Sequence, residues 1–377
     1  MVHTGKKRTV VNFGPGPAKI PEEVLQKAQT EFLEYEHTGI SVLEMSHRSP
    51  EFDGIMKETE KLLRDEMSIP NEFEVLFLQG GGSGQFAAVP MNLKFKSSSG
   101  SADYAVTGSW SAKAADEAKR YLDVNKVFTP MKPYTKIPEK SQWKFNADAA
   151  YVYYCANETV DGVEFQQPPE LKYHNVPLVA DISSNILSRP FDVAKHGLVF
   201  AGTQKNLGAA GLTIVIVRKD LLGHAESYTP SVLNYHENHK MNSVYNTPPV
   251  YSIYLTKLVL EWIRDKGGVH ALYERNKNKS ALIYDVVDDS QGFYYCPVDL
   301  SCRSNMNIPF RVGGRDGNSD LEKKFIQGAE KLDMISLKGH RSVGGIRASL
   351  YNAVSEEETR KLSEYMKEFM VTFKTEE

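Results

Sequence analysis

The sequence has few cysteines, no long apolar run and almost no net charge. Its three cysteines, Cys155, Cys296 and Cys302, are odd in number and widely spaced, so they predict neither a disulfide framework nor a C-x-x-C metal site. No apolar run reaches the length of about 18 residues that suggests a membrane span, and the first residues lack the apolar core of a secretory signal. We therefore expect a cytoplasmic protein with no metal and no membrane partner.

Length, composition and charge restrict the possible classes of function further. The chain has 377 residues, of which 41% are hydrophobic and 25% charged, and its formal net charge is −3. This composition is ordinary for a globular protein, and nothing in the overall charge predicts binding to nucleic acid or to an anionic membrane. A chain of this length predicts about two domains. If the protein binds an anion, a local group of residues must hold it, because the overall charge does not attract one.

Short apolar runs alternate with helix-like stretches through the first two thirds of the chain. Runs this apolar are typical of strands buried on both faces, and their alternation with helices predicts an open, doubly wound α/β domain with a mostly parallel sheet. One connecting helix is expected at 111–122 after a capping residue, Ser109, and a longer one at 250–268. The expected strands are 74–78, 104–107, 149–155, 177–181, 197–201 and 212–217.

The pattern changes after about residue 269. Strands are expected at 293–297, 306–312 and 345–351, with helices at 320–332 and at the end of the chain. This order predicts a smaller α+β domain. The predicted divisions are an N-terminal segment (1–16), a large domain (17–266) and a small C-terminal domain (267–377).

Polar groups follow several consecutive strands of the predicted sheet. Ligands of open α/β sheets bind at the carboxyl ends of the strands. The first run is followed by "QGGGSGQF", whose glycines let backbone N–H groups approach an anion at a helix N-terminus. That stretch has neither the Gly-Lys-Ser/Thr of a P-loop nor the third glycine of a dinucleotide fingerprint. The side chains that follow the later strands are Trp110, Thr159, Asp181 and Lys205.

Together these groups match what pyridoxal phosphate requires of a protein. A lysine forms the Schiff base, an acid keeps the ring nitrogen protonated, an aromatic ring stacks on the cofactor, and backbone donors hold its phosphate. Lys205 and Asp181 are the predicted catalytic pair. The residues therefore predict a pyridoxal phosphate enzyme.

Eight motifs in a fixed order resemble those of the phosphoserine aminotransferase family, which belongs to the fold-type I pyridoxal phosphate enzymes. The resemblance runs from residue 12 to residue 355 and implies the family's fold, a large domain with a mostly parallel sheet and a smaller α+β domain. The motifs are "SHRSPEF" (46–52), "QGGGSGQFAAVPMNL" (79–93), "TGSWSAKAADEA" (107–118), "NETVDGVEF" (157–165), "ADISSNILSRP" (180–190), "AGTQKNLGAAG" (201–211), "YNTPPV" (245–250) and "GHRSVGGIRASLYNA" (339–353).

The resemblance assigns roles to individual residues. Lys205 resembles the Schiff-base lysine, Asp181 the partner of the ring nitrogen and Trp110 the stacking ring. Asn246 and Thr247 resemble a pair that reaches the cofactor phosphate of the neighbouring subunit, which implies a homodimer with shared active sites. The other implied cofactor contacts are Gly82, Ser83, Thr159 and Gln204, and the implied substrate-binding residues are His47, Arg48, His340, Arg341 and Arg347.

The implied reaction moves the amino group of L-glutamate to 3-phosphohydroxypyruvate, which gives 2-oxoglutarate and O-phospho-L-serine for serine biosynthesis. Lys205 would move the substrate proton, Arg347 would grip the α-carboxylate, and the other cations would surround the distal anion. Action on 4-phosphohydroxythreonine and its 2-oxo acid is a further expectation. Ser83 stands where certain bacterial members have arginine, so one substrate-binding cation is missing there.

Three other functions would account for parts of the same sequence. A cysteine desulfurase of the same superfamily would need a reactive cysteine on a mobile loop, for which Cys302 is the only candidate. A nucleotide-binding dehydrogenase would explain the glycines but leaves Lys205 without a role. A non-catalytic binding protein on the same fold would lack the lysine or the acid, and both are present.

Overall fold

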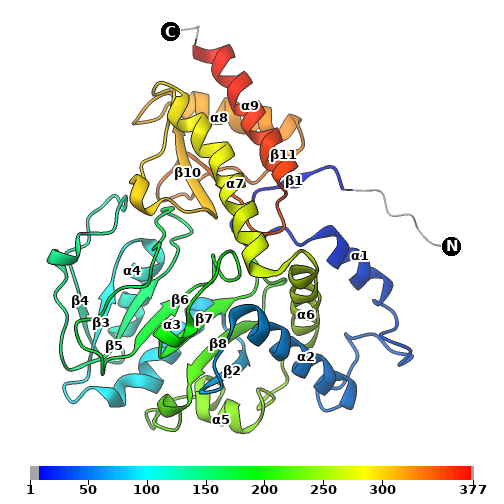
Figure 1. Ribbon diagram of the computed structural model, residues 1–377, viewed down its shortest axis with the longest axis vertical. Coiled ribbons are helices and arrows are strands. Elements are labelled where there is room, and N and C mark those ends of the chain that lie inside the picture. Colours follow the sequence, from blue (N-terminus) through cyan, green and yellow to red (C-terminus); the bar gives the residue numbers. More distant parts are fainter. Residues whose placement is uncertain (1–7, 375–377) are drawn as a thin grey trace.

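The computed structural model describes residues 8–374 and shows a larger part built on a wide sheet and a smaller part carrying α8, α9 and β10 (Figure 1). Residues 1–7 of the predicted N-terminal segment and residues 375–377 of the predicted small domain lie outside the described residues.

A seven-stranded sheet lies at the centre of the larger part, with the strand order β2-β8-β7-β6-β5-β3-β4. Only β8 runs against its neighbours; it pairs antiparallel with both β2 and β7. Ten residues separate β7 from β8, which is too short for the crossover helix that a parallel pair needs. The strands are β2 (Phe73–Leu78), β3 (Ser101–Ala105), β4 (Asp123–Lys126), β5 (Ala149–Cys155), β6 (Leu178–Asp181), β7 (Leu198–Gly202) and β8 (Thr213–Arg218).

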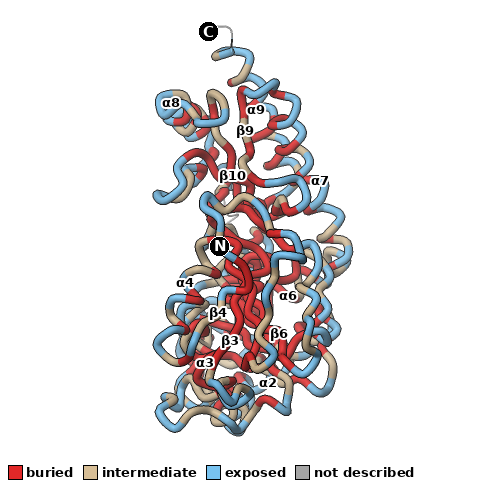
Figure 2. Tube along the Cα trace, turned by 90° about the vertical axis from the view of Figure 1, so that its left-hand side faces the viewer, coloured by how far each residue is buried: buried red, intermediate tan, exposed pale blue. Residues whose placement is uncertain are grey.

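Both faces of this sheet are buried, as the apolar runs predict. Along β5, Tyr151 and Tyr153 pack in one core and Val152 and Tyr154 in the other, because successive side chains of a strand point to opposite faces. The first core is covered by α3 (Gly81–Leu93) and α4 (Ser109–Ala118). The second is covered by α1 (Glu22–Thr30), α2 (Pro50–Met67), α6 (Val250–Asp265) and the start of α7 (Gly268–Asp289). Figure 2 shows this buried chain as red tube through the middle of the larger part.

The smaller part is an antiparallel three-stranded sheet, in the order β12-β10-β9, packed against helices. Its strands are β9 (Tyr294–Tyr295), β10 (Asn307–Val312) and β12 (Ile346–Ser349), and its helices are α8 (Ser319–Lys331), α9 (Glu356–Lys374) and the second half of α7. In addition, β1 (Val11–Asn12) pairs in parallel with β11 (Met334–Ile335), so the start of the described chain packs with the smaller part. The exact domain limits stay a prediction.

The predicted α/β architecture is confirmed, and two element predictions need correction. The strand expected at 104–107 is β3, at Ser101–Ala105. The polar start of β3 concealed it, because Asp103 is fully buried and accepts hydrogen bonds from Asn125 and from the backbone of Asn146. The helix expected at 111–122 is α4, and Ser109 is its first residue rather than its cap. The edge strand β4 is exposed and polar, and it was not expected.

Candidate active site

The carboxyl ends of β5, β6 and β7 and the first turns of α3 and α4 surround a cavity of about 350 Å³, which we call the central cavity. It lies where ligands of α/β sheets bind. Arg347 of β12 and His340, in the loop before β12, reach it from the smaller part of the molecule. Nine predicted site residues line it together: Gly82, Ser83, Trp110, Thr159, Asp181, Gln204, Lys205, His340 and Arg347.

Lys205 lies in the turn after β7 and points into the central cavity. Its Nζ donates a hydrogen bond to Thr159 Oγ1 at 2.7 Å and lies 5.7 Å from the centre of the Trp110 ring. Burial lowers the pKa of this amine, and the charge of Asp181 opposes that shift. A lowered pKa makes the neutral, nucleophilic form of a lysine more accessible. Gly16 passes close by, where a Cβ would lie 3.1 Å from Lys205 Cγ.

Asp181 is the last residue of β6 and is 5% exposed. Its Oδ1 accepts a hydrogen bond from the backbone N–H of Ser183 at 2.9 Å. Burial raises the pKa of this carboxyl, and the contact with Ser183 and the charge of Lys205 lower it. No cation lies within ion-pair distance of it in residues 8–374. A buried acid in this position suits a protonated ring nitrogen.

The first turn of α3 offers free backbone donors to the same cavity. Gly80 and Gly81 have φ angles of +97° and +60°, a conformation that glycine adopts without strain. Gly80 is the N-cap and supplies no side-chain acceptor, so the first N–H groups of α3 stay available. Such a helix start binds phosphate through its N–H groups and its dipole.

The first turn of α4, which carries Trp110, is capped by two carboxylates from the loop after β5. Glu158 accepts hydrogen bonds from the backbone N–H of Trp110 at 2.8 Å and of Ser111 at 2.9 Å, and Asp161 accepts one from Ser109 N–H at 2.7 Å. We call this arrangement the two-carboxylate cap. Burial and the nearby charge of Asp161 raise the pKa of Glu158 to about 8, against the hydrogen bonds from α4. A side chain at Gly108 would overlap Glu158.

Arg347 is 5% exposed and forms one wall of the central cavity. Its Nη1 donates a hydrogen bond to the carbonyl of Thr159 at 3.1 Å, and its Nε has no partner among the residues that the structure describes. An unpaired donor on a buried guanidinium is costly unless an anion binds there. His340 is half-buried, and burial together with the charge of Arg347 lowers its pKa, which Asp161 partly offsets.

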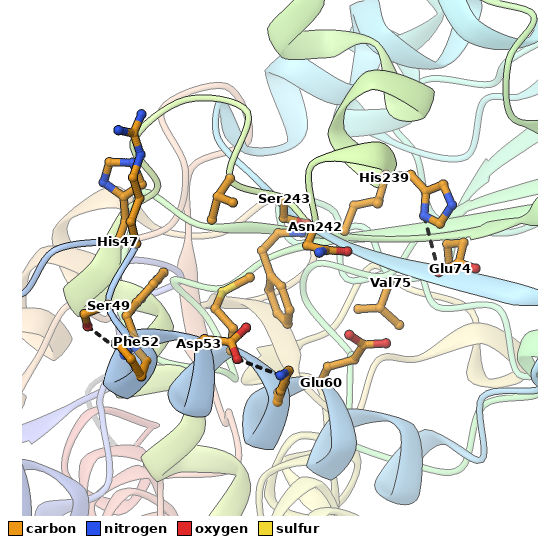
Figure 3. A pocket seen from close by; sticks show the side chains of 17 residues that line it. His47, Ser49, Phe52, Asp53, Glu60, Glu74, Val75, His239, Asn242 and Ser243 are labelled. Atoms are coloured by element: carbon orange, nitrogen blue, oxygen red, sulfur yellow. Dashed lines mark hydrogen bonds and ion pairs between the residues drawn. The ribbon is translucent and has the colours of Figure 1, made fainter.

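Five predicted residues do not line the central cavity. His47 and Arg48 line a second cavity of about 590 Å³ between α2 and β2, which we call the margin cavity because β2 is an edge strand of the sheet. Figure 3 shows His47 at one end of it and the Glu74–His239 pair at the other. Arg341 is exposed beside His340. Asn246 and Thr247 contact the Gln79 side chain, at 3.0 Å each, next to the glycines of α3.

Some residues of the central cavity were not singled out from the sequence. Phe86, Asn157, Ser183 and Ser184 line it, and Asn157 Nδ2 donates to Ser184 Oγ and to Asn307 Oδ1, both at 2.8 Å. Each lies within a motif that the sequence analysis quotes. The signal was therefore present, but nothing in one sequence separates these residues from their neighbours in the same motif.

Comparisons with known proteins agree with this geometry. Residues 10–362 match the family model "Aminotransferase class-V". A probable phosphoserine aminotransferase of Caenorhabditis elegans is 58% identical, with 98% of each chain covered. The chain belongs to the phosphoserine aminotransferases. Among solved structures, the phosphoserine aminotransferase of Bacillus circulans subsp. alkalophilus is 43% identical with a TM-score of 0.92, covering 97% of this chain and 99% of that one. The PLP-bound phosphoserine aminotransferase of Trichomonas vaginalis is 39% identical with a TM-score of 0.90, covering 95% and 99%.

Family membership confirms the expected fold type, the aminotransferase class and the cofactor, pyridoxal phosphate. The residues present fit that cofactor, since one cavity combines a lysine, a buried unpaired acid, an aromatic ring and a glycine-rich helix start. The desulfurase and dehydrogenase alternatives are wrong. Cys302 is 1% exposed, and its thiol contacts the carbonyls of Thr135 and Asp299. No helix in residues 8–374 is long and apolar enough to cross a membrane.

Proposed function

We propose that this phosphoserine aminotransferase transfers the amino group of L-glutamate to 3-phosphohydroxypyruvate and so forms 2-oxoglutarate and O-phospho-L-serine in L-serine biosynthesis. The observation that carries the proposal is that one cavity joins Lys205 and Asp181 to the buried guanidinium of Arg347, whose Nε has no partner among residues 8–374. An amino-group site and a carboxylate site thus lie side by side. The names of the relatives support the choice of substrates.

In this proposal the walls of the central cavity hold the cofactor. The first turn of α3, with Gly82 and Ser83, binds the cofactor phosphate, and Thr159 and Gln204 complete the contacts. Trp110 stacks on the ring and Asp181 pairs with the ring nitrogen. When bound, pyridoxal phosphate supplies an electron sink for the carbanion formed at the substrate Cα. All six residues line the cavity, which supports these assignments.

We assign the movement of the substrate proton to Lys205. A general base must lie within hydrogen-bond reach of the proton it takes, and its pKa works best near the operating pH. Burial lowers the pKa of Lys205 toward that range. Thr159 Oγ1, 2.7 Å from Lys205 Nζ, fixes the direction of the amine. Lys205 would therefore take the proton from the substrate Cα and deliver it, on the same face, to the cofactor C4′.

We assign the α-carboxylate of both substrates to Arg347, because its planar fork suits a carboxylate. Its bond to the Thr159 carbonyl links it to the residue that orients Lys205. The distal phosphate or γ-carboxylate is assigned to His340 and Arg341, together with His47 and Arg48. The last two lie in the margin cavity of their own chain, so they would act on the site of a second copy.

A homodimer with shared sites follows from the same reasoning. Asn246 and Thr247 would reach the cofactor phosphate of the neighbouring subunit, and His47 and Arg48 its substrate. None of these four lines the central cavity of its own chain, which supports the proposal. We also propose that the enzyme works in the cytoplasm, where its three unpaired cysteines stay reduced.

The direct test uses the purified, cofactor-loaded protein. Single-turnover conversion of the cofactor is followed by absorbance with L-glutamate, O-phospho-L-serine, L-serine and L-aspartate in separate reactions. We expect rapid conversion by the first two amino acids and slow conversion by the last two. Equal rates with O-phosphoserine and serine would contradict the substrate assignment. Adding 4-phosphohydroxythreonine as a fifth amino acid tests the second proposed substrate.

A further inference from the structure

Lys113 is an exposed cation beside the mouth of the central cavity that the proposed function does not use. It lies three residues after Trp110 on α4, which places both side chains on one side of the helix. Its Nζ is 4.3 Å from the centre of the Trp110 ring, and that ring lines the cavity. Within residues 8–374 Lys113 has no carboxylate partner. Lys119, just after the same helix, is in contrast paired with Asp116 at 2.8 Å.

The charges around this mouth leave an excess of positive charge. Lys113, Arg341 and Arg347 all lower the pKa of His340, so the charge of each acts on this ring. The opposing acids are Asp161 and Glu158 of the two-carboxylate cap. Asp161 is bound to the first N–H of α4, and the raised pKa of Glu158, about 8, keeps much of that carboxyl neutral near pH 7. Such a cluster favours a ligand with more than one negative charge.

The two substrates differ at this end of the site. A phosphate carries about −1.5 to −2 charges at neutral pH, whereas a γ-carboxylate carries one. Each cation near the distal group therefore attracts the phosphate more strongly than the carboxylate. Position 83, in the first turn of α3, offers only the uncharged hydroxyl of a serine. On α4, whose first turn also borders the cavity, the cation is Lys113.

We propose that Lys113 is a specificity-determining residue, which is held over Trp110 and favours a phosphate over a carboxylate at the distal end of the substrate. The inference rests on the proposed function, because it concerns how that site distinguishes its two amino acids. Contact with the Trp110 ring orients the ammonium of Lys113, which does not itself line the cavity. Lys113 would thus act on the substrate phosphate and not on the reacting atoms.

The test compares three variants of the cofactor-loaded enzyme. Lys113→Met keeps the length and the apolar stem but removes the charge, Lys113→Arg keeps the charge, and Lys119→Met is the matched control on the same segment. Two quantities are measured: the second-order constants for cofactor conversion by O-phosphoserine and by glutamate, and the affinity for inorganic phosphate by calorimetric titration. Because Lys113 is exposed, we expect all three variants to fold as the unmodified protein does.

We expect Lys113→Met to lower the constant for O-phosphoserine and the affinity for phosphate roughly tenfold each, and the constant for glutamate less than about threefold. Lys113→Arg and Lys119→Met should stay close to the unmodified enzyme. Equal losses with both amino acids would mean that Lys113 only holds the Trp110 ring, and they would overturn the inference. Constants that do not change with either amino acid would overturn it as well. If the unmodified enzyme itself fails with O-phosphoserine, the proposed function falls, and an unchanged phosphate affinity in Lys113→Met then overturns the inference separately.

Discussion

The central cavity and the margin cavity hold similar side chains in very different surroundings. In the central cavity, Asp181 and Arg347 are each 5% exposed, and both are oriented by hydrogen bonds to backbone groups. In the margin cavity, Arg48 is exposed and His47 half-buried, and acids such as Asp53 and Glu60 lie nearby on α2 (Figure 3). Fixed, buried charges are what chemistry requires, because the groups are already oriented when the substrate arrives.

From this difference we infer that one chain builds only part of the site. The central cavity combines every predicted group that acts on the reacting atoms. The groups predicted to hold the far end of the substrate are divided between the two cavities. Asn246 and Thr247, which are predicted to reach the cofactor phosphate, line neither cavity and contact Gln79. We infer that the second region completes the first in another copy of the chain.

Replacing Lys205 should have the largest effect, because it removes the only amine that lines the central cavity within residues 8–374. We expect Lys205→Ala to lower the rate of transamination at least about 10³-fold, since general acid–base catalysis alone contributes about 10²- to 10⁴-fold. The exposed Lys195→Ala variant is the control and should remain active. Borohydride reduction followed by peptide mapping should place the cofactor on Lys205, and a label on another lysine would contradict the assignment.

Mixing two inactive variants tests whether the active site is shared between chains. One variant is Lys205→Ala and the other is Asn246→Ala combined with Thr247→Ala. In a hybrid dimer one site receives a native Lys205 from one chain and a native Asn246 and Thr247 from the other. After random mixing of a twofold dimer, about one quarter of the original activity should return.

The control is each variant mixed with itself, which should stay inactive. Hybrid formation is checked with chains that carry different affinity tags. If tagged hybrids are isolated and show no more activity than the parents, the division of the site between subunits is wrong.

The central cavity was predictable because its elements leave local patterns in the sequence. Strands buried on both faces leave continuous apolar runs, so β5, β6 and β7 and the side chains at their ends were placed correctly relative to one another. A glycine run before a helix is an equally local signal for an anion. The central cavity could therefore be assembled from one chain and the rule that ligands bind at strand ends.

The two-carboxylate cap and the antiparallel direction of β8 could not be predicted from local sequence patterns. Glu158 caps a helix that begins 49 residues earlier in the chain, and its role depends on a backbone contact that no local pattern encodes. The direction of β8 depends on a loop length whose meaning is clear only once the neighbouring strands are known. The margin cavity shows the same limit, because "SHRSPEF" predicts an anion-binding segment without saying which copy of the site it serves.

Replacing Arg347 and Arg341 in turn compares a buried anion-binding arginine with an exposed one. Arg347→Ala should weaken both half-reactions by about 2 to 5 kcal/mol, because it removes a buried charged partner of the α-carboxylate that both amino acids share. Arg347→Lys should recover only part of this, since an ammonium lacks the planar fork. The exposed Arg341→Ala variant and the half-buried His340→Ala variant should reduce the reaction of O-phosphoserine more than that of glutamate.

The measurement is the ratio of second-order constants for O-phosphoserine and glutamate in single-turnover conversion. Arg347→Ala should leave this ratio nearly unchanged, whereas Arg341→Ala should lower it. The reverse pattern, a strong change of the ratio in Arg347→Ala and none in Arg341→Ala, would mean that the two roles have been exchanged.

The smallest expected effect is on the unfolding free energy, when one glutamate of each region is replaced by glutamine. Glu158→Gln places an amide NH₂ against the N–H donors of Trp110 or Ser111, so we expect it to cost about 1–3 kcal/mol of unfolding free energy at acidic pH. Glu60→Gln is the matched control in the margin cavity. Glu60 is half-buried, and within the described part of the chain it pairs only with Arg64 on its own helix, at 2.8 Å. Its replacement should therefore cost less than about 0.5 kcal/mol.

The stability cost of Glu158→Gln should depend on pH. Because the pKa of Glu158 is raised from 4.5 to about 8 in the fold, the folded protein binds more protons than the unfolded chain between these values, and stability falls as pH rises through that range. Glu158→Gln removes this slope, so its cost should shrink between about pH 5 and pH 8, as read from urea midpoints of the cofactor-loaded protein. A cost that grows with pH instead would mean that the hydrogen bonds from α4 outweigh burial and keep Glu158 charged throughout.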